Sequence, residues 1–372
     1  MPLKAKQVVA LIEKLAPPFL AASWDNSGWQ VGDSEKPVHR VLLSLDVNRQ
    51  VIDEAVRQEA QLIICHHPLL FKPLRQIMWQ DNVGQLVHRL IERGIGLYAA
   101  HTNLDLAPGG VNDVLARLLD LQEIRPLREE EGGNLFKLVV FVPVEHLDRV
   151  REAVCRAGAG HIGRYDYCTF QVAGTGTYRP LSGAQPFHGE VGEICLASEV
   201  RLETIIPAGL VKRVLTAMLQ AHPYEEVAYD LYKLENKFPG AGLGRVGSLE
   251  KDLPLAELAD VVKQKLGCRA LRFGGEPERL VRKVAICGGS GGELWRSALS
   301  AGADVLITGD IGYHLAGDML AAGMCFIDAG HFETEQPALL FLQQYLRQEI
   351  AGLGEGVEVL LSNYQRSPFN CC

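Results

Sequence analysis

The sequence predicts an α/β protein in which two similar α/β halves form one domain and a smaller α+β insert interrupts them. Three observations predict this fold class. Short apolar strands alternate with amphipathic helices in the first third of the 372 residues, the same order returns in the last third, and a segment of different character separates the two. We expect the first half at residues 1–127, the insert at 128–237 and the second half at 238–372.

The first half opens with helical periodicity over Lys4–Leu15, which Pro17 and Pro18 end. Three apolar strands and two helices are expected next, with the strands at 40–46, 62–65 and 96–100 and the helices at 48–58 and 83–92. This β-α-β-α-β order implies parallel strands joined by right-handed crossovers. Polar residues that follow such strands gather at the carboxyl edge of the sheet, where the sites of α/β proteins form.

The second half repeats this order, with strands expected at 283–287, 303–307 and 324–328. The spacing of polar residues also repeats, because His101 and Asp105 are four residues apart, as are His331 and Glu335. Any two α/β segments share the coarse element order, but the matching spacing favours a true internal duplication.

The insert contains two β-α-β units in succession. Their strands are expected at 134–142, 167–174, 199–206 and 226–234, and their helices at 145–157 and 209–221. This order is typical of the ferredoxin-like arrangement. Glycine-rich joints at Gly132-Gly133 and Pro239–Gly242 mark its two ends.

Composition excludes several classes of protein. The hydrophobic content of 47% is ordinary for a globular domain, and no run approaches about 18 consecutive apolar residues. No signal peptide is recognisable, so we expect a cytoplasmic protein without a membrane partner. The net charge of −8, with no block of lysine or arginine, argues against a nucleic-acid partner. Nine cysteines without a C-x-x-C pair predict reduced and mostly buried thiols.

The pair His66-His67 stands directly after the buried strand at 62–65 and before Pro68. Imidazole is the commonest side-chain ligand of zinc and iron, and two adjacent imidazoles serve little purpose in packing. Adding Asp105, His331 and Glu335, which follow other predicted strands, gives five nitrogen and oxygen ligands without sulfur. Because successive side chains diverge near a strand, the two histidines fit two ions about 3.5–4 Å apart better than one.

Each of these residues also has a structural interpretation. Asp105 could cap the helix that begins near Gly110, and Glu335 could be a carboxylate favoured by a helix dipole in the first turn, which Pro337 also suits. Taken together at one sheet edge, they favour a dinuclear metal site.

The sequence resembles the Nif-three-like family of dinuclear metal proteins, also known as GTP cyclohydrolase I type 2 homologs, over nearly its whole length. The motifs that carry the resemblance are Trp24–Gly32, His66-His67-Pro68, His101–Asp105, Gly242–Gly247, Gly288–Gly292, Thr308-Gly309-Asp310 and Gly330–Glu335. Trp29 stands where aliphatic residues are common in the family. The insert, with His222–Glu226, resembles the PII/CutA-like insert of longer members.

The resemblance places the metal ligands at His66, His67, Asp105, His331 and Glu335. It further implies two divalent ions per chain, most naturally zinc or iron, while manganese also suits such ligands. A ring-shaped homohexamer, a trimer of dimers with its metal sites facing an internal cavity, is implied as well.

Several other residues are candidates for the chemistry. We expect His101 or His314 to shuttle protons, although His101 could equally be a plain buried histidine. The loop Gly288–Gly292 could hold a phosphate through its amides or be a tight turn that needs glycine, and it lacks the Lys-Ser/Thr ending of a P-loop. Asp310 could support a ligand from outside, and Asp25 and Asn26 could fix a loop.

These features predict a metal-dependent hydrolase that uses a metal-bridging hydroxide on a nucleotide or another phosphate-bearing compound. The alternatives are a non-catalytic metal-binding regulator or metallochaperone, and an assembly scaffold.

Overall fold

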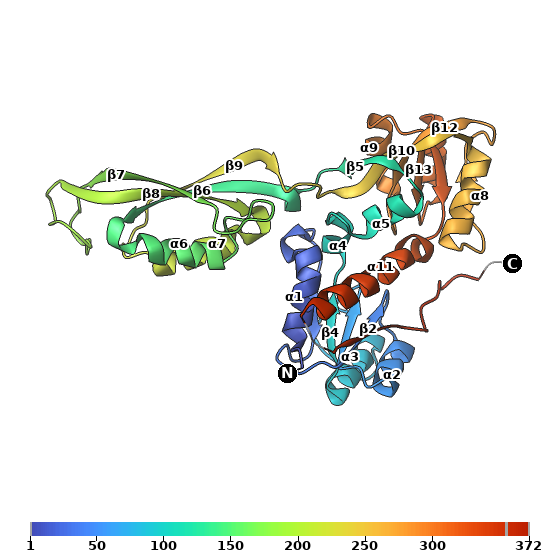
Figure 1. Cartoon of the computed structure of the whole chain (residues 1–372), viewed down its shortest axis with the longest axis horizontal. Coiled ribbons are helices and arrows are strands. Elements are labelled where there is room, and N and C mark those ends of the chain that lie inside the picture. Colours follow the sequence, from blue (N-terminus) through green and yellow to red (C-terminus); the bar gives the residue numbers. More distant parts are fainter. Residues whose placement is uncertain (1, 354–355, 371–372) are drawn as a thin grey trace. The chain divides into compact units, whose positions relative to one another are not determined.

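The computed structural model describes residues 2–353 and 356–370, and the chain divides into two compact units. One unit combines residues 1–130 with 240–372, and the other comprises residues 131–239 (Figure 1). The larger unit is therefore built from both ends of the chain. Within the described residues, no helix is both long enough and apolar enough to cross a membrane.

The first sheet of the larger unit has the strand order β1-β4-β3-β2-β15. Its strands are β1 (Gly28–Val31), β2 (Arg40–Ser44), β3 (Leu62–Cys65), β4 (Gly96–Ala99) and β15 (Glu358–Leu361). The helices of this region are α1 (Ala5–Leu15), α2 (Arg49–Arg57), α3 (Asn82–Arg93), α4 (Thr102–Leu106) and α5 (Val111–Leu118). Strands β15, β2, β3 and β4 run parallel, and β1 is antiparallel to β4.

The second sheet has the order β11-β14-β13-β12-β10-β5. Its strands are β5 (Gln122–Arg128), β10 (Leu243–Pro254), β11 (Arg272–Gly274), β12 (Leu280–Ile286), β13 (Val305–Thr308) and β14 (Cys325–Asp328). The helices are α8 (Leu255–Leu266), α9 (Trp295–Ser300), α10 (Tyr313–Ala321) and α11 (His331–Gly352). Strands β12, β13 and β14 are parallel, whereas β10 and β11 are antiparallel to their neighbours.

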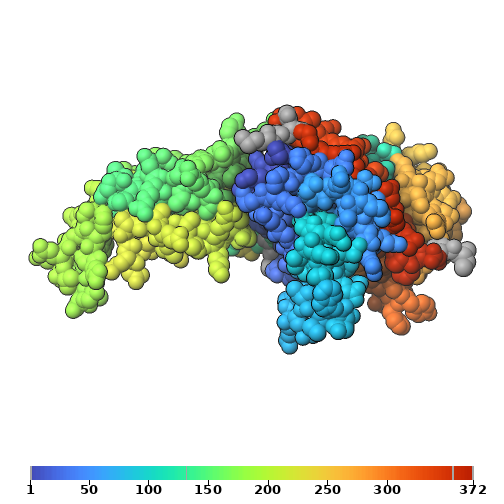
Figure 2. All heavy atoms as spheres, turned by 90° about the horizontal axis from the view of Figure 1, so that it is seen from below, coloured from blue at the N-terminus to red at the C-terminus, as the bar shows by residue number. Residues whose placement is uncertain are grey.

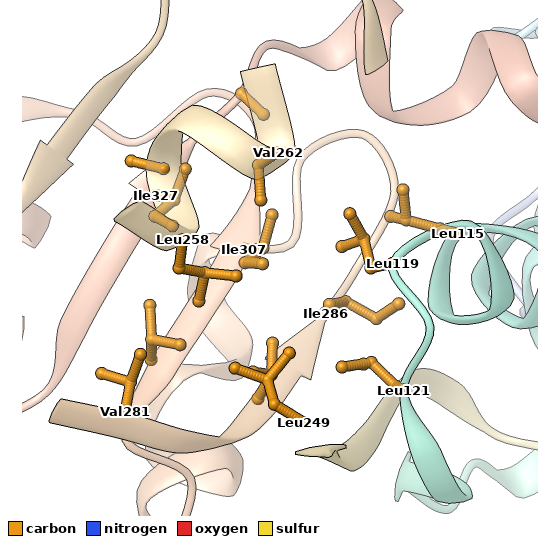
Figure 3. Close-up of a cluster of buried hydrophobic side chains, with 14 of the residues drawn as sticks. Leu115, Leu119, Leu121, Leu249, Leu258, Val262, Val281, Ile286, Ile307 and Ile327 are labelled. Atoms are coloured by element: carbon orange, nitrogen blue, oxygen red, sulfur yellow. The ribbon is translucent and has the colours of Figure 1, made fainter. Parts of the chain in front are cut away.

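This second sheet is buried on both faces, which explains why its parallel strands are continuously apolar. On one face, Ile286, Ile307 and Ile327 pack against Leu258 and Val262 of α8 (Figure 3). On the other face, alternate residues of the same strands pack against α9 and α10. The carboxyl ends of β12, β13 and β14 are thereby held at one edge.

The two sheets share a common plan. Each contains three consecutive parallel strands, and the third of these pairs with an antiparallel edge strand, β1 in the first sheet and β11 in the second. The segments that follow β4 and β14 both lead into helices, α4 and α11. The matching order is what an internal duplication would produce.

The smaller unit is a four-stranded antiparallel sheet in the order β7-β8-β6-β9. Its elements are β6 (Asn134–Pro143), α6 (Leu147–Arg156), β7 (Thr169–Tyr178), β8 (Cys195–Pro207), α7 (Val211–Ala221) and β9 (Tyr229–Lys237). Apolar side chains of both helices and of β6 and β8 form its core. The two helices lie side by side on one face of the sheet (Figures 1 and 2).

Several elements differ from the sequence-based expectation. Strands β1, β5, β10, β11 and β15 were not expected, because they carry mixed polar and apolar residues and their pairing depends on distant partners. All of them except β10 lie at an edge of a sheet. Helix α11 begins at His331, so Pro337 lies in the second turn and not in the first. The hydrogen bond that Pro337 cannot donate is therefore missing within the helix.

Candidate metal centre

The candidate ligands lie where the carboxyl edges of the two sheets meet. His66 and His67 directly follow β3, and their amides donate to Ser44 O at 3.0 Å and Leu45 O at 2.9 Å, which extends the parallel pairing with β2. Asp105 lies in α4, just after β4. His331 and Glu335 lie one turn apart at the start of α11, just after β14.

The Glu335 carboxylate is the centre of the group. Its Oε2 lies 3.0 Å from His67 Nε2, and its Oε1 lies 3.2 Å from His331 Nε2 and 3.6 Å from His66 Nε2. Asp105 Oδ1 lies 3.6 Å from His66 Nε2. The structure thus brings together all five residues that the sequence proposes as metal ligands, from both halves of the chain.

The outer nitrogen of each imidazole is engaged by an acceptor. His66 Nδ1 lies 2.8 Å from Ala100 O. The Nδ1 atoms of the other three histidines face carboxylates, at 2.9 Å for His67 and Asp46, 2.8 Å for His101 and Asp25, and 2.6 Å for His331 and Asp310. When Nδ1–H donates, Nε2 keeps its lone pair, which is the tautomer that ligates metal in proteins.

Three polar atoms of the centre are buried without a hydrogen-bond partner: His66 Nε2, Asp105 Oδ1 and Glu335 Oε2. Burying such atoms unpaired costs free energy, so buried polar groups in native proteins nearly always have partners. Divalent cations bound among these residues would supply the missing partners. The residues present therefore fit a metal ion.

Two overlapping groups of ligand atoms can be distinguished. His66, His67 and His101 form one group, and His67, His331 and Glu335 form the other, with all ligand atoms of a group within 4.8 Å of one another. His101, which the sequence proposes as a proton carrier, therefore lies close enough to serve as a ligand too.

The pKa values of these residues are shifted because carboxylates and imidazoles lie close together in a buried site. Burial opposes the charged form of His67, but the attraction of the neighbouring Asp46 and Glu335 carboxylates outweighs burial and raises the pKa of His67 to about 10. The hydrogen bond with Glu335 raises the pKa of His331 to about 9. Burial raises the pKa of Asp105, whereas the neighbouring histidines overcome burial and hold the pKa of Glu335 well below its ordinary value. The raised pKa values of His67 and His331 reflect the carboxylates around these rings, and the same carboxylates would attract a cation.

The carboxylates that contact the rings of His331 and His101 are themselves held in place by the local structure. Asp310 adopts a left-handed φ of 59°, which is uncommon for a residue other than glycine, and this conformation directs its carboxylate to His331. The Asp25 side chain accepts hydrogen bonds from Ser27 and Thr102 as well as from His101. Asp46 was missed by sequence reasoning, although its place after β2 matches that of Asp310 after β13.

The loop Gly288–Gly292 packs against the centre. A Cβ at Gly289, whose φ is 64°, would clash with the Glu335 carboxylate. The amides of Gly288, Gly289 and Gly291 already donate to side chains of Asn112, Thr334 and Thr308, respectively. These contacts favour the interpretation as a tight turn over the interpretation as a phosphate loop.

Two candidate residues are not part of the centre. His314 is exposed at the start of α10, where its ring contacts Tyr313, so the structure does not bring it together with the ligands. In the smaller unit, His222 lies 2.9 Å from Phe141 O through Nε2 and accepts from the Tyr224 amide through Nδ1 at 3.1 Å. That histidine shapes a turn.

The surroundings of the centre offer room for a ligand. A cavity of about 710 Å³ adjoins His67 and His331, and Arg272 is among its lining residues. Near His101, the exposed rings of Trp24 and Phe71 each lie 6.3 Å from the imidazole centroid.

The comparisons with known proteins show the family of this chain. A family model described as Duf34/NIF3 (NGG1p interacting factor 3) matches residues 3–368. The chain belongs to the Duf34/NIF3 family. This membership confirms the resemblance inferred from the sequence motifs.

Relatives in the Duf34/NIF3 family match over nearly the full length. A Bacillus subtilis protein named GTP cyclohydrolase 1 type 2 homolog is 41% identical over 368 residues, which cover 98% of this chain and 97% of that protein. A Mycobacterium tuberculosis protein of the same name is 37% identical over 377 residues, covering 100% and 95%.

Two solved structures are also similar. A Bacillus cereus protein related to NIF3 has a TM-score of 0.76 at 41% identity, with 100% of both chains covered. A Staphylococcus aureus protein has a TM-score of 0.75 at 29% identity, with 100% of this chain and 99% of that chain covered.

Proposed function

We propose that this Duf34/NIF3 protein is a metal-dependent hydrolase that holds two divalent ions. The observation that carries the proposal is the convergence of imidazole nitrogens and carboxylate oxygens, three of which are buried without a hydrogen-bond partner. Two such ions would lower the pKa of a water molecule and polarise a scissile bond. Nitrogen and oxygen ligands without sulfur suit zinc, iron or manganese.

We assign His66 and Asp105 to one ion, because His66 Nε2 lies 3.6 Å from Asp105 Oδ1. We assign His67 and His331 to the other ion, because their Nε2 atoms lie 3.4 Å apart. Glu335 faces histidines of both pairs, with Oε1 beside His66 and His331 and Oε2 beside His67, so its carboxylate could serve both ions. Asp46 and Asp310 hold the rings of His67 and His331 in place.

His101 has two proposed roles, as a further ligand or as a proton carrier. Asp25 accepts from its Nδ1, which leaves Nε2 free to bind a proton or a metal ion. The role of His314 as a second proton carrier stays a prediction. A His314→Ala variant tests it, because loss of a proton carrier lowers turnover and leaves bound metal unchanged.

The substrate class that we propose is a nucleotide or another phosphate-bearing compound. The proposal is supported by Arg272, which lines the cavity beside His67 and His331 and whose guanidinium pairs with Asp328, because guanidinium groups bind phosphate well. The relatives named GTP cyclohydrolase 1 type 2 homolog make GTP the first compound to test.

The test combines metal analysis with a turnover assay on GTP and a panel of phosphate esters. His67→Ala and Glu335→Ala should lose both bound metal and turnover, whereas His39→Ala, at an exposed position, should keep both. Turnover that persists in a metal-free variant contradicts the proposal. Metal that binds and exchanges without turnover of any compound would favour the metal-binding regulator or metallochaperone instead.

We further propose that the chain assembles as a homohexameric ring in the cytoplasm and that its insert is PII/CutA-like. The support is family membership and the β-α-β-β-α-β order of the insert. Light scattering should give six times the chain mass of 40.8 kDa, and a monomer or dimer at working concentration contradicts the ring.

A further inference from the structure

The smaller unit contains a cavity of its own, with a volume of about 610 Å³. Its walls come from β6, from the end of β7 and the segment that follows it, and from the turn before β9. Apolar and aromatic residues supply much of the lining, including Phe141, Leu181, Pro186 and Phe187. Ligand sites in proteins typically combine such walls with a few convergent polar groups.

A buried carboxylate lies in this cavity. Glu199 of β8 is only 8% exposed, and its Oε1 accepts a hydrogen bond of 2.9 Å from the Tyr224 hydroxyl. Among the described residues, no lysine or arginine forms an ion pair with Glu199. A buried carboxylate usually has a cationic partner, because burial of an unpaired charge is costly.

The backbone of the neighbouring strand makes room for this carboxylate. Gly176 of β7 lies beside Glu199, and a Cβ at position 176 would clash with the carboxylate oxygens. Glycine weakens a strand interior, and it often marks a place where another group approaches closely. The absence of a side chain at Gly176 therefore lets the Glu199 carboxylate approach the backbone of β7.

Three aromatic rings also line the cavity. The Tyr224 ring centroid lies 6.0 Å from that of Tyr178 and 5.9 Å from that of Phe187. All three residues line the cavity. The faces of such rings carry partial negative charge and attract cations within about 6 Å of the centroid.

The charged residues that line the cavity are mostly negative. Glu199, Glu225 and Glu226 supply three carboxylates, against the single guanidinium of Arg179, whose side chain is exposed. Glu225 also accepts a hydrogen bond of 2.8 Å from the Gln185 amide, which holds the segment after β7 in place. The cavity is therefore acidic, aromatic and partly enclosed.

We propose that this cavity binds a small organic ammonium ion. The Glu199 carboxylate would face the ammonium group, the rings of Tyr178, Tyr224 and Phe187 would surround it, and the apolar walls would cover its hydrocarbon part. This site is independent of the metal centre and of the proposed hydrolase activity.

The test uses the full-length chain, with choline, tetramethylammonium and phenethylammonium as cationic probes and 3,3-dimethyl-1-butanol as the uncharged isostere of choline. Titration calorimetry should detect at least one of the cations, and added salt should weaken its binding. The uncharged isostere should bind at least about tenfold more weakly than choline, since it lacks the charge that carboxylate and rings attract.

Variants locate the site. Glu199→Gln should weaken cation binding at least about tenfold and leave the isostere unaffected, because it removes one partner of a buried charge pair. Phe187→Leu keeps the cavity wall apolar but removes the aromatic ring. It should therefore weaken binding of the cations and leave binding of the uncharged isostere unchanged. Glu203→Gln is the matched control on the same strand, since Glu203 pairs with Lys137 and Arg201, and it should bind like the wild type.

Three outcomes would overturn the proposal: no binding by any of the three cations, equal binding of choline and its isostere, or unchanged cation binding in both Glu199→Gln and Phe187→Leu. Circular dichroism and bound metal, measured on each variant, should match the wild type and so separate loss of the site from loss of the fold.

Discussion

At the scale of single residues, the candidate centre is determined by what holds each imidazole. Four histidines each engage Nδ1 with a carbonyl or carboxylate, and Nε2 then faces Glu335 or a neighbouring ring. The side chains are therefore oriented before any ion binds. Such orientation reduces the entropy lost on metal binding, so the supporting carboxylates should matter almost as much as the ligands.

The first prediction concerns the support of His331. Asp310→Ala removes the acceptor of His331 Nδ1 and should lower affinity for zinc by about 10–100-fold, the usual cost of losing such a partner. Competition with a chromogenic chelator measures the affinity. Asp318→Ala, at an exposed position of α10, serves as control and should bind zinc like the wild type. Equal affinity in Asp310→Ala would argue against the orienting role.

The second prediction concerns the glycine that contacts Glu335. Gly289→Ala should lower both zinc affinity and the free energy of unfolding, because the new Cβ displaces the Glu335 carboxylate. Gly267→Ala is a matched control, with a φ of 67° against 64° and no atom within 4 Å of its Cβ. Both variants carry the backbone strain of about 1 kcal/mol, so only the difference between them reports the clash. Identical zinc affinities would contradict this account.

At the scale of elements, the halves of the larger unit are joined by a fully buried arginine. Arg245 of β10 donates to Gly242 O and to Gly244 O, and its Nη2 lies 3.2 Å from Ala107 O and 2.6 Å from Asp113 Oδ2. Ala107 and Asp113 belong to the first half of the chain, directly after α4 and in α5. This contact fixes α4, which carries Asp105, relative to the second sheet.

The third prediction follows from that contact. Arg245→Met should lower the free energy of unfolding by about 3–5 kcal/mol, because it leaves the Asp113 carboxylate without its buried partner. Arg245→Met combined with Asp113→Asn should recover part of the loss. Urea unfolding measures both, and Arg282→Met, at an exposed position, should remain within about 0.5 kcal/mol of the wild type. A double variant no more stable than the single one would argue against the pairing.

At the scale of the whole molecule, the centre requires both ends of the chain. His66, His67 and Asp105 come from the first sheet and its following helix, and His331 and Glu335 come from the segment after the second sheet. An ion bound there would link residues separated by more than two hundred positions in the sequence, with the insert between them. Metal binding and folding of the larger unit should therefore be coupled.

The fourth prediction is that metal stabilises the folded chain. Zinc at about a thousand times its dissociation constant should raise the free energy of unfolding by about 4 kcal/mol, and removal by a chelator should reverse the gain. Calorimetry with and without zinc measures the change in melting temperature. His67→Ala should melt at the same temperature in both conditions, and a zinc-dependent shift that persists in this variant would place the binding site elsewhere.

The sequence by itself determined the parallel strands of both halves, the family and a set of five proposed ligands. These follow from local signals, since continuous apolar runs predict buried strands and polar residues after them predict the carboxyl edge. The edge strands β11 and β15 and the interior strand β10 escaped prediction because their pairing depends on partners far away in the chain.

Only the tertiary structure decided which groups face one another. It placed Asp46, Asp25 and Asp310 against ligand rings, brought His101 into the group and left His314 outside it. It also showed why Gly289 must lack a side chain. The physical reason is that orientation, burial and missing hydrogen-bond partners arise when distant segments pack together, and no local pattern of residues encodes them.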